Sequence, residues 1–392
     1  MNLNTIADKI VFKYLKSINH GNLEIINYDN KKFNFGNTND ELKVKIKINK
    51  PGFAYQIIKK GSIGLAEAYI NGDFETDNLT NLIELSAKNI NLIHKFSGFL
   101  DFSFFNSIKN IFLKNNKERS KKNISMHYDL GNEFFSLWLD PSLTYSSAIF
   151  EKEEKSLESA QMNKYNKLIS LINPRPGDKL LEIGCGWGGF AEYVGKNHDI
   201  KMDCITISQK QFDYAKKRIF DNGLNEKINI KLKDYRDIKE KYNSIASIEM
   251  IEAVGKNYLS SYFQIIKSNL SKNGKAAIQA ITINDNLFER YKTKQDFIQK
   301  YIFPGGFLPS KQSLYDLSIK KGLAIDKYDS YGFHYSNTLK LWRDEFLNKW
   351  DQISGQGFDL NFKRMWNFYL SYCEAGFKSK NIDLIQFSLQ NR

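Results

Sequence analysis

The sequence predicts an α/β protein with a doubly wound, mostly parallel, Rossmann-like sheet and a smaller α+β domain at its N-terminus. Three observations carry this prediction. From residue 155 onward, strand and helix patterns take turns, which is typical of a parallel sheet. The segment Gly184–Gly189 places a glycine-rich turn between one of these strands and the next helix. Residues 1 to about 90 instead mix short alternating stretches with helical patterns, which indicates a separate unit.

In the N-terminal part, the segment Leu42–Ile48 alternates apolar residues with lysines and predicts a half-buried strand. We expect an N-terminal domain over residues 1–105, a basic linker over 106–123 and a larger domain over 124–392. A chain of 392 residues is long enough to bury two such cores.

The larger domain is predicted to begin its alternation with a helix and to end with a strand. One of its helices is followed by Gly223, which suits a C-terminal cap. In chain order, the expected elements are helix Lys155–Ile172, strand Lys179–Ile183, helix Trp187–Asn197, strand Lys201–Ile207, helix Gln209–Asp221, strands Ile228–Leu232 and Ser244–Ile248, helix Tyr258–Leu270, strand Ala276–Ile283, helices Ser310–Lys320, Asn337–Trp350 and Phe362–Phe377, and a last strand around Ile385, Phe387 and Leu389.

The composition limits the possible environments of the protein. Cys185, Cys204 and Cys373 lie far apart, which argues against a disulfide framework or a zinc site and favours a reducing compartment. We expect no metal. Residues Met1–His20 lack the apolar core of a signal peptide, and the chain has no run of 18 apolar residues. A cytoplasmic protein is therefore expected, associated peripherally with the inner face of the membrane.

The formal net charge of +13 is compatible with a polyanionic partner, either nucleic acid or an anionic membrane surface. A nucleotide bias in the genome, which would enrich Lys, Asn and Ile, explains the charge equally well. Residues 106–123 carry six basic side chains against one acid and follow the aromatic stretch Phe99–Phe105. Such a pair suits peripheral membrane contact, although a solvated linker with a helix docked on the core is the slightly favoured alternative. We expect no nucleic acid, because the basic run lacks interleaved aromatic residues.

The glycine turn admits two cofactor classes. Gly184, Gly186 and Gly189 match the dinucleotide pattern, and Asp203 lies at the distance expected of a ribose-binding acid. However, Asp203 falls inside the second predicted strand rather than at its end. Glu182, directly before the turn, and the additional Gly188 favour S-adenosylmethionine. The turn therefore predicts a methyltransferase rather than a dehydrogenase.

The wider pattern resembles the cyclopropane-fatty-acyl-phospholipid synthases and the related mycolic acid cyclopropane synthases, which implies the class I methyltransferase fold. The segment Leu-Glu-Ile-Gly-Cys-Gly-Trp-Gly-Gly is one of an ordered set of motifs that covers nearly the whole chain. The motifs are Gly61–Gly72, His127–Asn132, Thr144–Ala148, Leu181–Gly189, Thr206–Gln211, Asp234–Asp237, Met250–Gly255, Phe303–Gly306, Tyr335–Leu339 and Tyr372–Phe377.

The resemblance also implies which residues bind S-adenosylmethionine. Two glycines would approach its methionine and ribose parts, a hydroxyl and an amide would bind the ribose, and an aromatic ring would flank the adenine. The expected cofactor-binding residues are Tyr145, Ser146, Gly184, Gly186, Thr206, Gln211, Tyr235, Arg236 and Ile248.

In the related enzymes, a cis double bond of an acyl chain attacks the sulfonium methyl group. The carbocation that results loses a proton while the ring closes, so water must be excluded. The resemblance implies that bicarbonate is the base, held by Glu252, Tyr335 and the backbone of Ile281.

Two further positions of this cluster depart from the family pattern. Ser147 stands where the family has cysteine, and Gln279 stands where it has histidine. A hydroxyl and an amide can still bind an anion, but Gln279 cannot titrate. The identity of the product therefore stays open, because the same cation could lose a different proton and leave a methylene branch.

Taken together, the sequence predicts an enzyme that forms a cyclopropane on an unsaturated phospholipid acyl chain at the membrane surface. The alternatives are a methylene- or methyl-branched acyl product, methylation of a non-lipid small molecule, and a lipid-binding protein without catalysis. The apolar segment Tyr301–Pro309, broken by Pro and Gly, is expected to be a loop that either admits the acyl chain or packs against the N-terminal region. A homodimer is expected from the resemblance alone.

Overall fold

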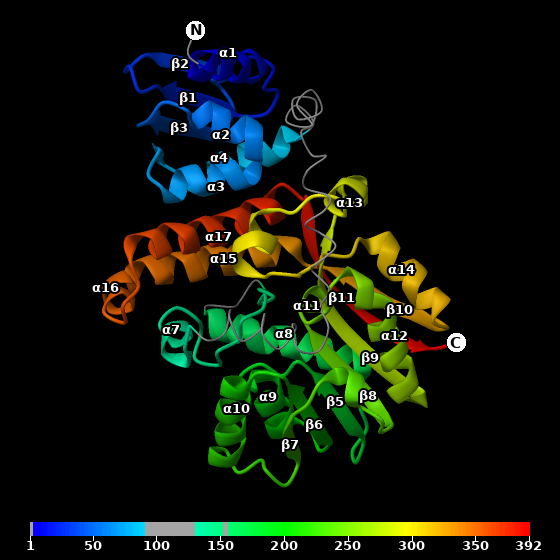
Figure 1. Ribbon diagram of the computed structural model, residues 1–392. Coiled ribbons are helices and arrows are strands. Elements are labelled where there is room, and N and C mark those ends of the chain that lie inside the picture. Colours follow the sequence, from blue (N-terminus) through cyan, green and yellow to red (C-terminus); the bar gives the residue numbers. More distant parts are fainter. Residues whose placement is uncertain (1–2, 91–129, 152–155) are drawn as a thin grey trace.

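The computed structural model describes residues 3–90, 130–151 and 156–392, and it contains two sheets (Figure 1). The expected linker 106–123 and both predicted domain boundaries lie outside the described residues. Among the described helices, none combines the length and the apolarity that crossing a bilayer requires.

The N-terminal unit is a four-stranded sheet, in the order β2-β1-β3-β4, covered by helices. In β3, Lys43, Lys45 and Lys47 are exposed while Val44, Ile46 and Ile48 are buried, which confirms the predicted half-buried strand. The elements are α1 Leu3–Leu15, β1 Asn22–Ile26, β2 Lys32–Gly36, β3 Lys43–Ile48, α2 Phe53–Lys60, α3 Ser62–Ile70, β4 Phe74–Thr76 and α4 Leu79–Lys88.

The larger unit is built on a seven-stranded sheet in the order β10-β11-β9-β8-β5-β6-β7. Strands β7, β6, β5, β8 and β9 are parallel to one another, whereas β11 and β10 add an antiparallel edge next to β9. The strands are β5 Lys179–Ile183, β6 Lys201–Thr206, β7 Ile228–Leu232, β8 Tyr242–Ile248, β9 Leu270–Ile283, β10 Leu323–Ser330 and β11 Ile382–Asn391. The predicted doubly wound, mostly parallel sheet is confirmed.

Serine and aspartate side chains cap several helices of this unit. Ser156, Ser208 and Asp359 each accept a hydrogen bond from the backbone three residues on, and Ser310 forms a capping box with Ser313. The helices are α7 Asn132–Ser136, α8 Leu157–Ile172, α9 Gly189–Asn197, α10 Gln209–Asp221, α11 Ile251–Val254, α12 Leu259–Asn269, α13 Asp285–Tyr291, α14 Lys311–Lys320, α15 Gly332–Asn348, α16 Trp350–Ser354 and α17 Leu360–Lys378.

Three sequence predictions in this unit were wrong or incomplete. The edge strand β10 was missed, because most of its residues are exposed and polar. The helix expected at Asn337–Trp350 begins at Gly332 and is interrupted at Lys349, where α16 starts. The segment expected to be all loop starts inside a π-helical turn, Ile298–Ile302, and becomes irregular only from Phe303.

Helices α15 and α17 lie between the two sheets (Figure 1). Their side chains form an aromatic cluster with the segment that follows α7, in which Trp138 packs edge-on against Trp342 and Trp366, with ring centroids 5.8 and 5.9 Å away. Another side of α17 contacts the N-terminal unit, where the Asn367 amide donates to the Tyr69 hydroxyl at 2.9 Å. The two units are thus joined through α17.

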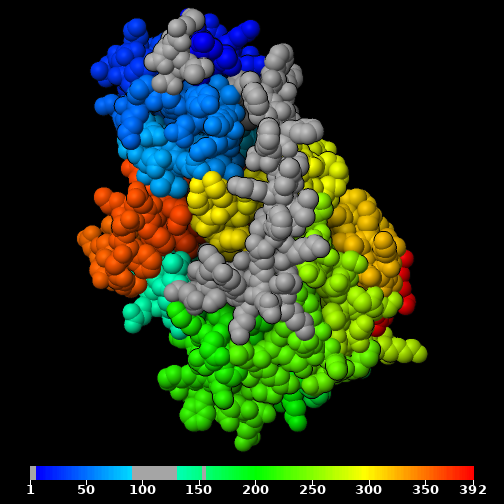
Figure 2. All heavy atoms as spheres, viewed as in Figure 1, coloured from blue at the N-terminus to red at the C-terminus, as the bar shows by residue number. Residues whose placement is uncertain are grey.

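A second contact joins the units at the yellow segment around residue 300, which lies against the N-terminal unit in Figure 2. Glu67 of α3 accepts hydrogen bonds from the Lys300 ammonium and the Tyr301 hydroxyl, both at 2.7 Å. Burial raises the pKa of Glu67, but the hydrogen bonds from Lys300, Lys60 and Tyr301 outweigh it and lower this pKa to about 2. The segment predicted as an entrance loop therefore also packs against the N-terminal region.

Candidate active site

The site lies where the strand order reverses. The chain runs outward from β5 through β6 to β7 and then returns to place β8 on the other side of β5. Ligands of open α/β sheets bind in the crevice outside the carboxyl ends of the strands at such a point. The turn that follows β5 and the residues that follow β8 both end at this crevice.

The glycine turn after β5 needs its glycines. Gly184 has φ +84°, and a Cβ added there would lie 2.8 Å from Cγ of Met250. Gly186 has φ +52°, and a Cβ added there would meet nothing within 4 Å. The turn therefore leaves open space over bare backbone at Gly186, which is what close approach of a ligand requires.

A cavity of about 1300 Å³ extends from this turn into the N-terminal unit. Pockets for one small ligand are usually ~300–1,000 Å³, so the volume leaves room for a second molecule beside a cofactor. Every expected cofactor-binding residue lines it: Tyr145, Ser146, Gly184, Gly186, Thr206, Gln211, Tyr235, Arg236 and Ile248. Of the expected catalytic residues, Glu252, Ile281 and Tyr335 line the cavity, whereas Ser147 and Gln279 are fully buried behind it.

The residues at the end of β6 form a polar pair. The Thr206 hydroxyl donates to Oε1 of Gln211 at 3.0 Å and accepts from the backbone N–H of Ser208. Both side chains are buried, and both line the cavity. The Gln211 amide nitrogen is thereby oriented as a donor, which suits a sugar hydroxyl.

The next side chains along the cavity are Tyr235 and Arg236. Tyr235 packs edge-on against Tyr262 at 5.7 Å, so its ring is held in place. Arg236 makes a bidentate ion pair with Asp234, at 2.8 and 2.6 Å. The guanidinium is thus fixed close to the ring that it partly covers.

Tyr145 and Ser146 close the cavity from the segment that precedes α8. The Tyr145 hydroxyl lies 2.8 Å from the Tyr369 hydroxyl. Oγ of Ser146 accepts from the ammonium of Lys164 at 2.8 Å. Burial lowers the pKa of Lys164 to about 7, against the opposing charges of Glu249, Asp140 and Glu182.

The centre of the polar cluster is Glu249, which sequence reasoning missed. Its Oε2 accepts from the Tyr335 hydroxyl at 2.6 Å. Its Oε1 accepts from the Gln279 amide and from the backbone N–H of Ser147, both at 2.8 Å. Glu249 lines the cavity. The motif that carried the resemblance starts one residue later, at Met250; a carboxylate directly after a buried strand was the available signal.

Ser147 and Gln279, the two departures from the family pattern, both contact this cluster. The Ser147 hydroxyl donates to the carbonyl of Ala148, contrary to the expected hydroxyl contact. Ser147 instead serves the cluster through its backbone, whose N–H donates to Glu249 and whose carbonyl accepts from the Gln279 amide at 3.4 Å. The Gln279 amide is oriented because its oxygen accepts from Gln386 at 2.9 Å, which turns its nitrogen toward Glu249. Glutamine thus provides the fixed donor without titrating.

Glu252 differs from Glu249 in its surroundings. Its Oε1 accepts from the backbone N–H of Ile281 at 2.5 Å, so the expected backbone contribution of Ile281 is present. Its Oε2 is buried and has no hydrogen-bond partner among the described residues. Burial and the charge of Glu249 raise the pKa of Glu252 to about 8. Burial also raises the pKa of Glu249, but Tyr335, Ser147 and Gln279 oppose this rise.

At neutral pH, one carboxyl group of the pair Glu249 and Glu252 is therefore ionised and the other is protonated. Two carboxyl groups in contact with one apolar cavity do not both ionise readily, and the one with more donors keeps the charge. Glu249 has three donors and the buried Lys164 nearby, whereas Glu252 has one. We assign the carboxylate to Glu249 and the neutral carboxylic acid to Glu252.

This assignment predicts a pH-dependent stability difference between the wild type and Glu252→Gln. Between pH 4.5 and 8, the unfolded carboxyl ionises while the folded one stays protonated, so the folded state binds more protons and stability falls as pH rises. Glutamine cannot ionise. The variant should gain stability relative to the wild type over this range, on the order of a few kcal/mol at most.

The measurement is chemical unfolding of both proteins at pH 5 and pH 8.5. Glu240→Gln is a matched control, because Glu240 is exposed and the Lys179 ammonium lowers the pKa of its carboxyl. A difference between Glu252→Gln and the wild type that is the same at both pH values would contradict the assignment.

The strand order, the glycine turn over open space and the polar groups at the switch point define a class I S-adenosylmethionine-dependent methyltransferase. The model of the mycolic acid cyclopropane synthetase family matches residues 115–387, and the chain belongs to this family. A domain model of unknown function matches residues 10–95.

Relatives and solved structures agree. The chain is 34% identical over 352 residues to tuberculostearic acid methyltransferase UfaA1 of Mycobacterium tuberculosis, covering 87% of this chain and 82% of the relative. It is 32% identical to cyclopropane-fatty-acyl-phospholipid synthase of Escherichia coli, covering 89% and 88%. The structure of mycolic acid cyclopropane synthase CmaA1 complexed with SAH and CTAB aligns with a TM-score of 0.65 at 27% identity, covering 69% of this chain and 98% of that one. The protein is an S-adenosylmethionine-dependent methyltransferase of fatty acyl lipids.

Proposed function

We propose that this enzyme adds the methyl carbon of S-adenosylmethionine to the cis double bond of an unsaturated phospholipid acyl chain and closes a cyclopropane ring. The observation that carries the proposal is the continuous cavity, which joins the glycine turn after β5 to the apolar face of the N-terminal sheet. A cofactor alone would not need the second half of the cavity, which lies in the N-terminal unit.

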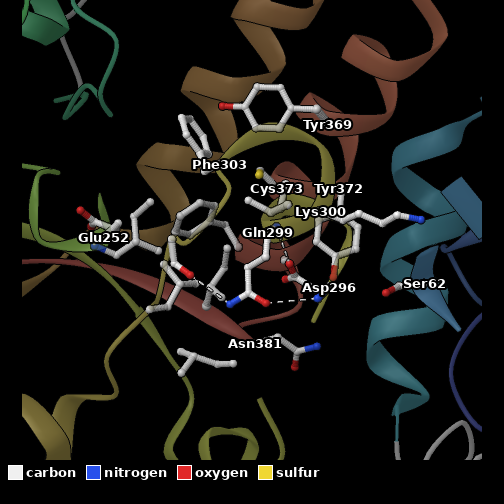
Figure 3. A pocket seen from close by; sticks show the side chains of 18 of the residues that line it. Ser62, Glu252, Asp296, Gln299, Lys300, Phe303, Tyr369, Tyr372, Cys373 and Asn381 are labelled. Carbon is white, nitrogen blue, oxygen red and sulfur yellow. Dashed lines mark hydrogen bonds between the residues drawn. The ribbon is translucent and has the colours of Figure 1, made fainter. Parts of the chain in front are cut away.

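The second half of the cavity is suited to an acyl chain. The same face of β3 that the alternation predicted to be buried supplies Ile46 and Ile48 to its lining, and Phe53 and Leu82 add to it. In Figure 3, Glu252 lies on one side and Ser62 of α3 on the other, with Phe303, Tyr369 and Cys373 between them. A long apolar substrate could thus extend from the carboxyl pair into the N-terminal unit.

The residues around the carboxyl pair would orient the substrate and exclude water. When bound, S-adenosylmethionine supplies an electrophilic methyl group. Thr206, Gln211 and Tyr235 would hold its ribose and adenine, because they present a fixed amide and ring to the cavity. Aromatic walls such as Phe303 and Tyr369 would keep water away from a substrate carbocation.

A peripheral contact with the membrane is part of the proposal. An acyl chain must leave the bilayer to reach a buried site, and a net charge of +13 favours anionic headgroups. The basic segment 106–123 remains the predicted contact. Activity on vesicles containing anionic phospholipid should therefore fall as salt is raised, because screening weakens attraction between exposed charges.

The test is incubation with S-adenosylmethionine and vesicles of monounsaturated phosphatidylglycerol, followed by mass analysis of the acyl chains. The expected product is heavier by one methylene and has lost its double bond. A product that keeps a displaced double bond would replace the cyclopropane with a methylene branch. Absence of any modified acyl chain would overturn the phospholipid proposal.

The methylene-branched product is the second candidate. Two observations favour it: the donors around Glu249 differ from the family pattern at Ser147 and Gln279, and one relative is named a tuberculostearic acid methyltransferase. Which proton leaves the cation depends on where the accepting oxygen lies relative to the new methyl group. The presence of a double bond in the product distinguishes the two, because the cyclopropane product has none.

A further inference from the structure

The position of the Glu249 carboxylate bears on the base of the reaction. The resemblance implies a bound bicarbonate, and such an anion needs hydrogen-bond donors that are not already used. In this chain, Tyr335, Gln279 and the backbone N–H of Ser147 all donate to Glu249. These donors would not be available to an added bicarbonate, which would also lie beside a carboxylate in a buried site. Burying a charge without a compensating partner costs on the order of several kcal/mol. The residues present do not fit bicarbonate.

We propose that the side chain of Glu249 replaces bicarbonate and is itself the base that removes the proton during ring closure. This inference rests on the proposed function and names the proton acceptor of that same site. The carboxylate comes from the chain, so the reaction should need no external anion.

The backbone conformation of Glu249 also indicates a functional role for this residue. Its φ is +48°, in the left-handed region that residues other than glycine, asparagine and aspartate seldom adopt. Such strain, of order 1–3 kcal/mol, persists where the surrounding structure holds it and is frequent at functional sites. Here it aims the carboxylate at the cavity, where three donors hold both of its oxygens.

The surroundings keep the carboxylate ionised and therefore able to accept a proton. The buried ammonium of Lys164 attracts it, and Glu252 next to it holds its proton instead of competing for the charge. Tyr335 also fixes the side chain, and its ring stacks on Phe377 at 4.5 Å. A base held in one orientation loses little freedom as the reaction proceeds.

The step balances as follows. The alkene π pair forms a bond to the transferred methyl carbon, while the carbon–sulfur bond breaks and leaves its pair on sulfur. A C–H bond of that methyl group then breaks, its electron pair closes the second C–C bond to the cationic carbon, and the proton passes to a carboxylate oxygen of Glu249. Solvent takes up this proton after the product leaves.

Two variants of the full-length enzyme test the inference, assayed with monounsaturated phospholipid vesicles and S-adenosylmethionine in buffer freed of carbon dioxide and in buffer with added bicarbonate. Glu249→Gly removes the carboxylate and relieves the positive φ, so the chain should fold. Glu249→Gln keeps the volume and removes the base. Binding of S-adenosylhomocysteine, measured by calorimetry, controls for folding in each.

We expect the wild type to turn over equally with and without bicarbonate. Both variants should lose at least about 100-fold in turnover, the size of effect that a positioned base supplies. Bicarbonate should restore Glu249→Gly at least tenfold, because it can occupy the vacated position, and should not restore Glu249→Gln. A wild type that requires bicarbonate, or a Glu249→Gln variant that keeps its turnover, would overturn the inference.

A calorimetric titration with bicarbonate separates this inference from the proposed function. If the wild type modifies no phospholipid under any condition, the proposed substrate is wrong, and the titration still decides what occupies the site. Binding of bicarbonate by Glu249→Gly but not by the wild type supports the replacement. Binding by the wild type rejects it.

Discussion

Replacing Gly184 by alanine is expected to weaken S-adenosylmethionine binding at least about 100-fold while the protein stays folded. A side chain in the left-handed region costs about 1–2 kcal/mol. The added Cβ would also lie 2.8 Å from Cγ of Met250, and overpacking of this kind costs about 1–3 kcal/mol. The turn can relieve the backbone strain and the close contact only by moving the backbone that faces the cofactor. A loss of about 2.8 kcal/mol in binding free energy corresponds to a 100-fold weaker affinity.

The measurement is calorimetric titration with S-adenosylmethionine, alongside thermal unfolding. Gly223→Ala is the matched control: its φ is +68°, it follows α10, and its added Cβ would meet nothing within 4 Å. The control should lose about 1 kcal/mol of stability and bind normally. Equal binding by the two variants would show that the turn after β5 does not hold the cofactor.

Replacing Arg343 by methionine is expected to destabilise the protein by about 3 kcal/mol or more. Arg343 of α15 pairs with Glu374 of α17, which also accepts from the hydroxyl of Thr80 in α4 at 3.1 Å. Glu374 is only 1% exposed. Without Arg343, a buried carboxylate at the junction of the two units would keep one cation, Lys378 at 2.8 Å.

The free energy of unfolding should be measured in urea for this variant and for Lys340→Met. Lys340 lies on the same helix and pairs with Asp344, but both are largely exposed, so its loss should change stability by less than about 1 kcal/mol. Similar values for the two variants would mean that the buried pair does not hold the junction. A larger loss for Arg343→Met would show that this buried pair stabilises the junction of α4, α15 and α17.

Most of the parallel part of the sheet was predictable to within two residues, although β9 begins at Leu270 rather than at the expected Ala276. The strands β5 and β7 and the helix α10 have the predicted bounds, because short apolar runs, cap residues and glycines act within a few positions of the chain. The exposed edge strand β10 gave no such signal. Its residues are polar, and its existence depends on pairing with β11, far along the chain.

At the site, the sequence motifs predicted which residues line the cavity better than they predicted what each residue contacts. All nine expected cofactor-binding residues line one cavity. The polar cluster was expected around Glu252, yet Tyr335, Gln279 and the backbone of Ser147 donate to Glu249 instead. Glu252 is bonded only to the backbone of Ile281 in the described part of the chain. The expectation came from a family pattern in which the residue at 249 had no part.

The sequence by itself determined the fold class, the methyltransferase family and the turn that faces the cofactor, because these depend on local periodicity and on glycines at fixed spacing. Only the tertiary structure decided which of two neighbouring glutamates receives more hydrogen bonds, and that difference is the ground for the proposals on charge and on bicarbonate. That difference depends on donors from residues 147, 279 and 335, which the segment before α8, the strand β9 and the helix α15 bring together around Glu249. No spacing along the chain encodes how many hydrogen bonds a buried carboxylate receives, and that number sets its protonation.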